Sequence, residues 1–117
     1  MATTTDIANK ALTRIGVRTF DNAVDAGTLS QTVDALTDLH ETMVSMPNPV
    51  VNWELDAIPS RCVGPLVDEL AWYIRDDFSV PDSKKQSLQD AQIVARGQLY
   101  SFIEKPDDGE PVQVQSF

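Results

Sequence analysis

Apolar residues recur at helical spacing in four stretches of this chain, which predicts four amphipathic helices. The first predicted helix covers residues 5–15 and ends at Gly16, a residue type that favours the left-handed conformation after a helix. Thr4 or Thr5 can cap its start. The apolar positions are Ile7, Ala8, Ala11, Leu12 and Ile15.

The second predicted helix covers residues 29–46 and begins near Thr28 or Ser30. Its apolar positions are Leu29, Val33, Leu36, Met43 and Val44. The opposite face of this helix carries Asp34, Asp38 and Glu41. Because three carboxylates without a further ligand make a poor metal site, this face is predicted to be solvated. His40 lies on the apolar side and is expected to be a hydrogen-bonded boundary residue.

The third predicted helix covers residues 60–78, starts around Pro59 or Pro65, and is apolar on more than one side. One face consists of Val67, Leu70, Ala71, Ile74 and Phe78. Leu66, Trp72 and Tyr73 lie off that face. Such a helix is either surrounded by other helices or pressed against another subunit.

The fourth predicted helix covers residues 83–104 and opens with the capping-box pattern of Ser83 and Gln86. Its predicted core face is Leu88, Ala91, Ala95, Leu99 and Phe102. A second, narrower apolar stripe consists of Ile93, Tyr100 and Ile103.

Two long connections and a tail complete the pattern. In the connection between Gly16 and Gly27, the side chains expected to anchor the loop to the core are Phe20 and Val24. Prolines exclude a helix between the second and third predicted helices. Apolar residues alternate with polar ones there, which predicts an extended segment. The apolar positions are Trp53, Leu55 and Ala57.

The end of the chain alternates apolar and polar residues after a proline and an acidic turn, as a strand that lacks a partner would. Its apolar positions are Val112, Val114 and Phe117. We expect this tail to be mobile in the free protein and to become ordered on a partner, with a frayed terminus as the alternative.

These patterns predict an all-α fold, a four-helix bundle with long ordered loops and an extended C-terminal tail. The helical domain is assigned to residues 1–105 and the tail to residues 106–117. The predicted core includes Leu12, Ile15, Leu36, Leu70, Ile74, Leu88 and Leu99.

Composition narrows the possible functions. The 117 residues suit one domain, and 18 acidic against 9 basic residues give a formal charge of -9, which opposes nucleic-acid binding. The chain shows neither a secretion signal nor an apolar run long enough to cross a membrane, so folding in a cytoplasm is expected. Cys62 is the single cysteine and is predicted to be a small buried hydrophobic residue.

No pattern of catalysis or of cofactor binding is present. The chain has one histidine, no G-x-S-x-G turn, and isolated glycines, so neither a triad nor a phosphate loop is indicated. Adjacent carboxylates on a helix diverge, and these pairs are interpreted as surface charge. They are Asp68 with Glu69, Asp76 with Asp77, and Asp107 with Asp108. We therefore predict no enzyme, no cofactor and no metal.

The order of several short motifs resembles one viral family. Residues 11–17 read Ala-Leu-Thr-Arg-Ile-Gly-Val, and residues 34–39 read Asp-Ala-Leu-Thr-Asp-Leu after a long loop. Residues 57–59 read Ala-Ile-Pro, and Leu70-Ala71 and Phe78 follow. Over residues 6–104 this succession is similar to the head-to-tail adaptor proteins of tailed bacteriophages, in particular the packaged-DNA stabilisation or tail accessory factors of short-tailed phages.

The resemblance implies a small helical bundle that assembles as a ring, commonly of twelve copies, beneath the portal after DNA packaging. It implies portal and tail or nozzle proteins as partners, a location in the virion neck, and packaged DNA that passes without specific binding. An acidic wall would let DNA slide past. We expect the contacts to involve apolar residues outside the core, namely Trp53, Tyr73, Ile93, Tyr100, Ile103, Val112, Val114 and Phe117.

Two other functions are compatible with the sequence. A monomeric acidic binding module, such as a DNA mimic, is suggested by the charge and by the acidic face of the second helix. A small hydrolase is suggested only by the abundance of carboxylates. The aromatic and aliphatic residues outside the predicted core favour the ring over the DNA mimic, because a mimic would carry charges at phosphate-like spacing on its surface.

Overall fold

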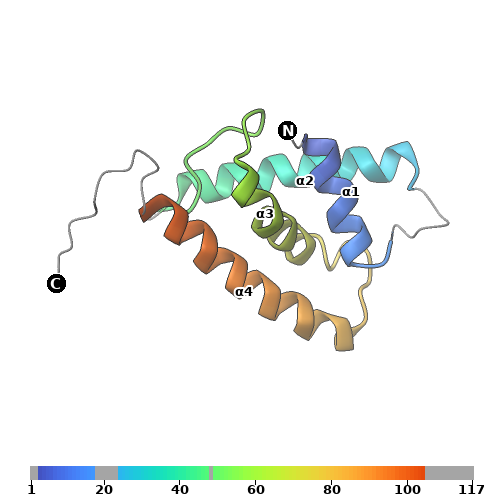
Figure 1. The fold of residues 1–117 in the computed structure, drawn as a ribbon. Coiled ribbons are helices and arrows are strands. Elements are labelled where there is room, and N and C mark those ends of the chain that lie inside the picture. Colours follow the sequence, from blue (N-terminus) through green and yellow to red (C-terminus); the bar gives the residue numbers. More distant parts are fainter. Residues whose placement is uncertain (1–2, 18–23, 48, 105–117) are drawn as a thin grey trace.

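The computed structural model describes residues 3–17, 24–47 and 49–104 of the chain. Four α-helices follow one another: α1 (Thr4–Arg14), α2 (Ala26–Ser45), α3 (Ser60–Tyr73) and α4 (Asp82–Glu104). Figure 1 shows α2 and α4 on opposite sides of α3, with α1 against α2 and α3. The described residues contain no strand, and the predicted all-α bundle is confirmed.

The core is built around α3, which packs against each of the other three helices, whereas α4 packs against α3 alone among the described helices. All seven predicted core residues are buried: Leu12, Ile15, Leu36, Leu70, Ile74, Leu88 and Leu99. Cys62 is buried with them, as its apolar neighbours predict. Half-buried Val24, Phe78 and Phe102 pack against this core.

The first two helices start slightly earlier than the apolar pattern predicts, because residues outside that pattern cap them. Thr3, rather than Thr4 or Thr5, forms a reciprocal capping box with Asp6 at the start of α1. Asp25 caps α2 by accepting the backbone N–H of Thr28, and hydrogen bonds from Thr28 hold the pKa of Asp25 below its ordinary value. Gly16 has φ of 85° and follows α1 as predicted.

The third helix ends at Tyr73, five residues before the predicted end, because its last turn is held by a local contact. The Arg75 guanidinium donates a hydrogen bond of 2.7 Å to the Trp72 carbonyl oxygen and stacks 3.5 Å from the centroid of the Trp72 ring. The chain then turns through residues 74–79 and places Val80 in the core. The apolar position Phe78 therefore belongs to a turn and not to the helix.

Ser79 in this turn has φ of 53°, the left-handed region that residues with a Cβ atom disfavour. Ser79→Gly should raise the free energy of unfolding by up to about 1 kcal/mol, because it relieves this conformation but adds freedom to the unfolded chain. Urea unfolding is the measurement. Ser87→Gly, inside α4, is the matched control and should lower stability by about 0.5 kcal/mol, because serine is already a weaker helix former than alanine. Equal effects of the two substitutions would contradict the prediction.

The fourth helix begins at Asp82, one residue earlier than predicted, and the predicted side-chain cap is not formed. Ser83 lies inside the first turn, while the Pro81 carbonyl oxygen accepts the backbone N–H groups of Lys84 and Lys85 at 2.9 and 3.1 Å. The predicted capping box of Ser83 and Gln86 is therefore wrong. The bonds to Pro81 are the ordinary first backbone hydrogen bonds of a helix, which the carbonyl of the preceding residue accepts.

The connection between α2 and α3 is irregular, and the predicted alternation holds only in part. Trp53 and Leu55 are half-buried against the core between exposed neighbours, as predicted, but Ala57 is exposed. The buried residues of the connection are Val50, Val51 and Ile58. The segment is fastened to α2 by His40, whose Nε2 lies 2.7 Å from the Trp53 carbonyl oxygen. His40 is thus hydrogen-bonded as the sequence predicts, but it is buried and does not lie at the boundary of the core. Phe20 and the tail from Pro106 lie outside the described residues.

Candidate interaction surface

The predicted contact residues are distributed over several parts of the molecule. Tyr73, Ile93 and Tyr100 are exposed, and Ile103 is half-buried at the end of α4. Trp53 is half-buried against the core, so much of its ring is used within the chain. Val112, Val114 and Phe117 lie outside the described residues.

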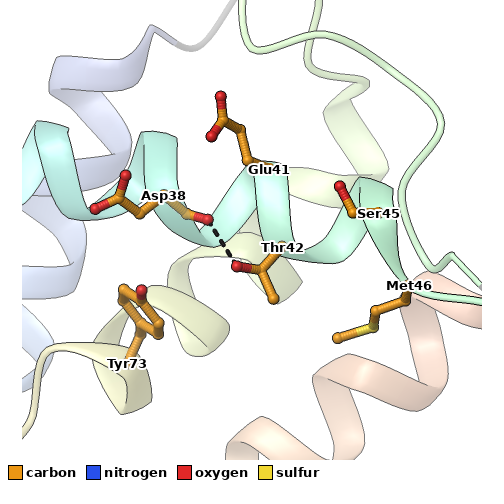
Figure 2. Close-up of a pocket in the computed structure, with 6 residues that line it drawn as sticks. All are labelled: Asp38, Glu41, Thr42, Ser45, Met46 and Tyr73. Carbon is orange, nitrogen blue, oxygen red and sulfur yellow. Dashed lines mark hydrogen bonds between the residues drawn. The ribbon is translucent and has the colours of Figure 1, made fainter.

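A groove runs along α2 toward the end of α3 (Figure 2). It has a volume of about 640 Å³ and is lined by Asp38, Glu41, Thr42, Ser45, Met46 and Tyr73. The Thr42 hydroxyl is turned back onto its own helix and donates to the Asp38 carbonyl oxygen at 3.0 Å. The groove is shallow and open to solvent, so it suits contact with another chain better than enclosure of a small molecule.

The position of α4 beside this groove is fixed by a buried carboxylate. Glu69 on α3 is 1% exposed, and its Oε2 and Oε1 accept hydrogen bonds from Arg96 Nε at 2.6 Å and Nη2 at 3.0 Å. Gln92 adds a third donor to Oε1 at 3.2 Å. Hydrogen bonding to Glu69 raises the pKa of Arg96 above its ordinary value. This network joins two successive turns of α4 to α3 and thereby sets the register between the two helices.

The interpretation of Glu69 as surface charge is therefore wrong. Glu69 lies one turn after Leu66 and beside Leu70, on the side of α3 that packs against other helices. This position in the sequence could have indicated that Glu69 is buried. Its partner Arg96 is 27 residues further along the chain, so sequence spacing alone does not pair them. Asp68, in contrast, is partly exposed and forms an ion pair with Arg14 of α1.

Arg96 also connects α4 to the end of α2, because its Nη1 lies 3.9 Å from the Met46 sulfur at the groove. At about 100° per residue, Ile93, Gly97 and Tyr100 fall on one stripe next to the Arg96 side of α4. We call these three residues the α4 stripe. Ile93 is 60% exposed, and the sequence analysis missed Val94, which is equally exposed on the other flank of the helix.

Charge is distributed unevenly over these surfaces. The exposed carboxylates Asp34, Asp38 and Glu41 on α2 form no ion pair with another described residue. In contrast, residues 91–103 of α4 include no Asp or Glu, and their single charged residue, Arg96, is compensated by Glu69. The chain thus has an acidic surface on α2 and a mostly apolar stretch of α4, which begins one turn after the exposed Asp90 on the same face.

Within residues 3–17, 24–47 and 49–104, no group of three His, Cys, Asp or Glu side chains is placed to hold a metal ion. None of the helices in this part of the chain is long and apolar enough to cross a membrane.

No protein-family model, curated protein or solved structure matches this chain. Its function must therefore be inferred from the surfaces of the molecule itself and from the order of its sequence motifs.

Proposed function

We propose that this protein is a structural head-to-tail adaptor of a tailed bacteriophage. Copies of it form a ring, commonly of twelve, that joins the portal to tail or nozzle proteins and helps to retain the packaged DNA. The observation that carries the proposal is the surplus of exposed apolar side chains outside the core, on α4 and at the end of α3. They are Tyr73, Ile93, Val94 and Tyr100.

These side chains are of the kind that anchors protein interfaces. Aromatic residues contribute much of the binding energy at such contacts because they bury a large area with few rotatable bonds. They lie in two places, Tyr73 at the end of α3 and the others along α4. A subunit of a closed ring needs two different contact surfaces, because each copy meets one neighbour on either side.

The acidic surface suits the proposed position around a DNA channel. Exposed Asp34, Asp38 and Glu41 repeat along α2 at intervals of three and four residues, which places them on one face. Repeated around a ring, this face would form a negative wall that repels phosphates, and DNA could move past it without being held. The proposal places the protein in the virion neck after assembly in the host cytoplasm.

The alternative is a monomeric acidic module, such as a DNA mimic, and the observation in its favour is the same acidic face of α2. The two proposals predict particles of different mass, a ring for the adaptor and a monomer for the acidic module. Native mass spectrometry of the protein alone, and mixed with a candidate portal protein, should detect a ring or a ring bound to the portal. A monomer in both samples would overturn the adaptor proposal and favour the acidic module.

Assembly should respond to salt in a direction that follows from the charge of -9. Acidic copies repel one another, and salt screens this repulsion at a Debye length of about 8 Å at 0.15 M ionic strength. Raising the salt concentration should therefore promote rings or leave them intact, as measured by sedimentation velocity. If moderate salt dissociated the rings, ion pairs between subunits would be the main source of their stability.

A further inference from the structure

A second groove lies between α2 and the connection that leads to α3, and we call it the Glu54 groove. It has a volume of about 460 Å³, and α2 and the connection both contribute to its lining, which consists of Thr37, His40, Glu41, Val44, Ser45, Glu54 and Leu55. Glu41 and Ser45 also line the groove of Figure 2, so the two grooves adjoin along the last turns of α2.

The Glu54 groove contains a buried hydrogen-bond acceptor that has no donor among the described residues. The Trp53 carbonyl oxygen only accepts, so His40 Nε2, at 2.7 Å, carries the proton, and Nδ1 of the neutral ring is an acceptor. No described hydrogen bond reaches Nδ1, although His40 is only 7% exposed. Because a buried acceptor without a partner costs free energy, a donor from outside the chain would be stabilising here.

The groove also carries negative charge that no described residue neutralises. Glu41 of α2 and Glu54 of the connection are both exposed and form no ion pair within the described part of the chain. The last turn of α2 has no basic residue, although the partial negative charge at the end of a helix favours one. Residues 19–60 contain seven carboxylates and none of the nine basic residues. The groove is therefore complementary to a positively charged donor.

The lining favours a lysine or arginine side chain of a polypeptide over a metal ion or a small amine. Among the described residues, no three ligands are placed to hold a metal ion. Val44, which is 43% exposed, and half-buried Leu55 provide an apolar wall for the aliphatic stem of a long basic side chain. Because Glu41 lines both grooves, an extended segment can cover both, whereas a small amine would leave most of this surface in water.

A second copy of this chain is a poor source of such a side chain. A copy carries a formal charge of -9 and is repelled by the acidic surface of α2. Four of its basic side chains already pair with carboxylates of their own chain, namely Arg14, Arg75, Lys85 and Arg96. A basic segment of a different protein is attracted to this surface instead.

We propose that the Glu54 groove binds a segment that bears arginine or lysine and belongs to a protein other than this chain. The basic side chain pairs with Glu41 and Glu54 and supplies the donor that His40 Nδ1 lacks. The inference rests on the proposed function in taking this protein to be a portal, tail or nozzle protein, and it adds the surface and the chemistry of the contact. Asp34 and Asp38 do not line this groove and stay available for the acidic wall.

His40 is the single histidine of the chain, so its ring signals in an NMR spectrum report on this groove alone. Titration of the protein with tetra-arginine, blocked at both ends, should shift these signals. Spermine has a similar charge but no planar guanidinium groups, so it should bind at least about threefold more weakly. His40 signals that stay in place at saturating peptide would overturn the proposal. Equal affinities would also overturn it, because a small amine would then suit the groove as well as a peptide.

Glu41→Gln combined with Glu54→Gln tests the charges, and the melting temperature should not fall, since neither carboxylate has a described ion pair. The dissociation constant for tetra-arginine should rise by about fivefold or more at low ionic strength, because two charge contacts are lost. The matched control, Asp77→Asn with Asp82→Asn, removes the same charge near the connection between α3 and α4, toward the other end of the molecule from the end of α2 (Figure 1). It should change the constant by less than about twofold.

Three outcomes separate this inference from its alternatives and from the proposed function. If the two double variants bind tetra-arginine equally well, the inference is wrong while the adaptor proposal stands. Sedimentation velocity should show no weaker self-association of the Glu41 and Glu54 variant than of the wild-type protein, and a loss would mean that a second copy occupies the groove instead. A protein that binds the peptide in the groove but stays monomeric, alone and with a portal protein, would support the groove and overturn the proposed function.

Discussion

Replacing Arg96 by alanine should lower the free energy of unfolding by about 3–5 kcal/mol, because it leaves the charge of a buried carboxylate without its partner. Glu69 is 1% exposed, and Arg96 supplies two of its three described hydrogen bonds. The remaining donor, Gln92, is neutral and cannot compensate for the charge. Urea unfolding followed by circular dichroism measures the loss.

The matched control is Arg14→Ala, which removes the other arginine that pairs with a carboxylate of α3. Arg14 and its partner Asp68 are both partly exposed, so water can replace the lost contact and the expected loss is below about 1 kcal/mol. Similar losses for the two arginines would show that water reaches Glu69. In that case the network would not set the register between α3 and α4.

A double substitution separates the cost of a stranded charge from the value of the pair. Glu69→Leu combined with Arg96→Met replaces both charges by apolar side chains of similar size. Such replacements of buried ion pairs are often neutral or stabilising, so the double variant should recover most of the stability that Arg96→Ala loses. If the double variant were as unstable as Arg96→Ala, the packing of the arginine side chain would matter more than its charge.

The helices could be predicted from the sequence because the apolar period reports directly which face of a segment is buried. Leu36, Leu70 and Leu99 are buried where that period places them. The helix ends were less predictable, because they depend on single contacts, such as the cap formed by Thr3 and not by Thr4 or Thr5, and the stacking of Arg75 on Trp72. Several neighbouring residues have the same capping preference, so the sequence does not select among them.

The candidate surface was predictable only in part, for a related reason. Ile93 and Tyr100 stand out in the sequence as apolar residues off the core face of a long helix. An isolated glycine in a helical pattern, such as Gly97, also fits close packing within the fold, and only the open space around it shows that no neighbouring side chain requires it. The Glu69 network was not predictable, because its members come together only when α3 and α4 pack.

Leu70→Ala should lower the free energy of unfolding by about 2–5 kcal/mol, because it opens a cavity at the centre of the bundle. Leu70 is fully buried on α3, the helix that packs against the other three. Alanine has the highest helix propensity, so the loss reports the cavity and not a weakened helix. For a domain whose total stability is about 5–15 kcal/mol, this loss is a large fraction.

The comparison variant for Leu70→Ala is Val44→Ala, which also truncates an aliphatic residue within a helix. Val44 is 43% exposed, so its truncation should change stability by less than about 0.5 kcal/mol. Urea unfolding of both variants, fitted with a common slope, gives the two losses on one scale. A loss below about 1 kcal/mol for Leu70→Ala would mean that the site collapses around alanine or is reached by water. The packing of α3 against three helices would then contribute less to stability than its burial indicates.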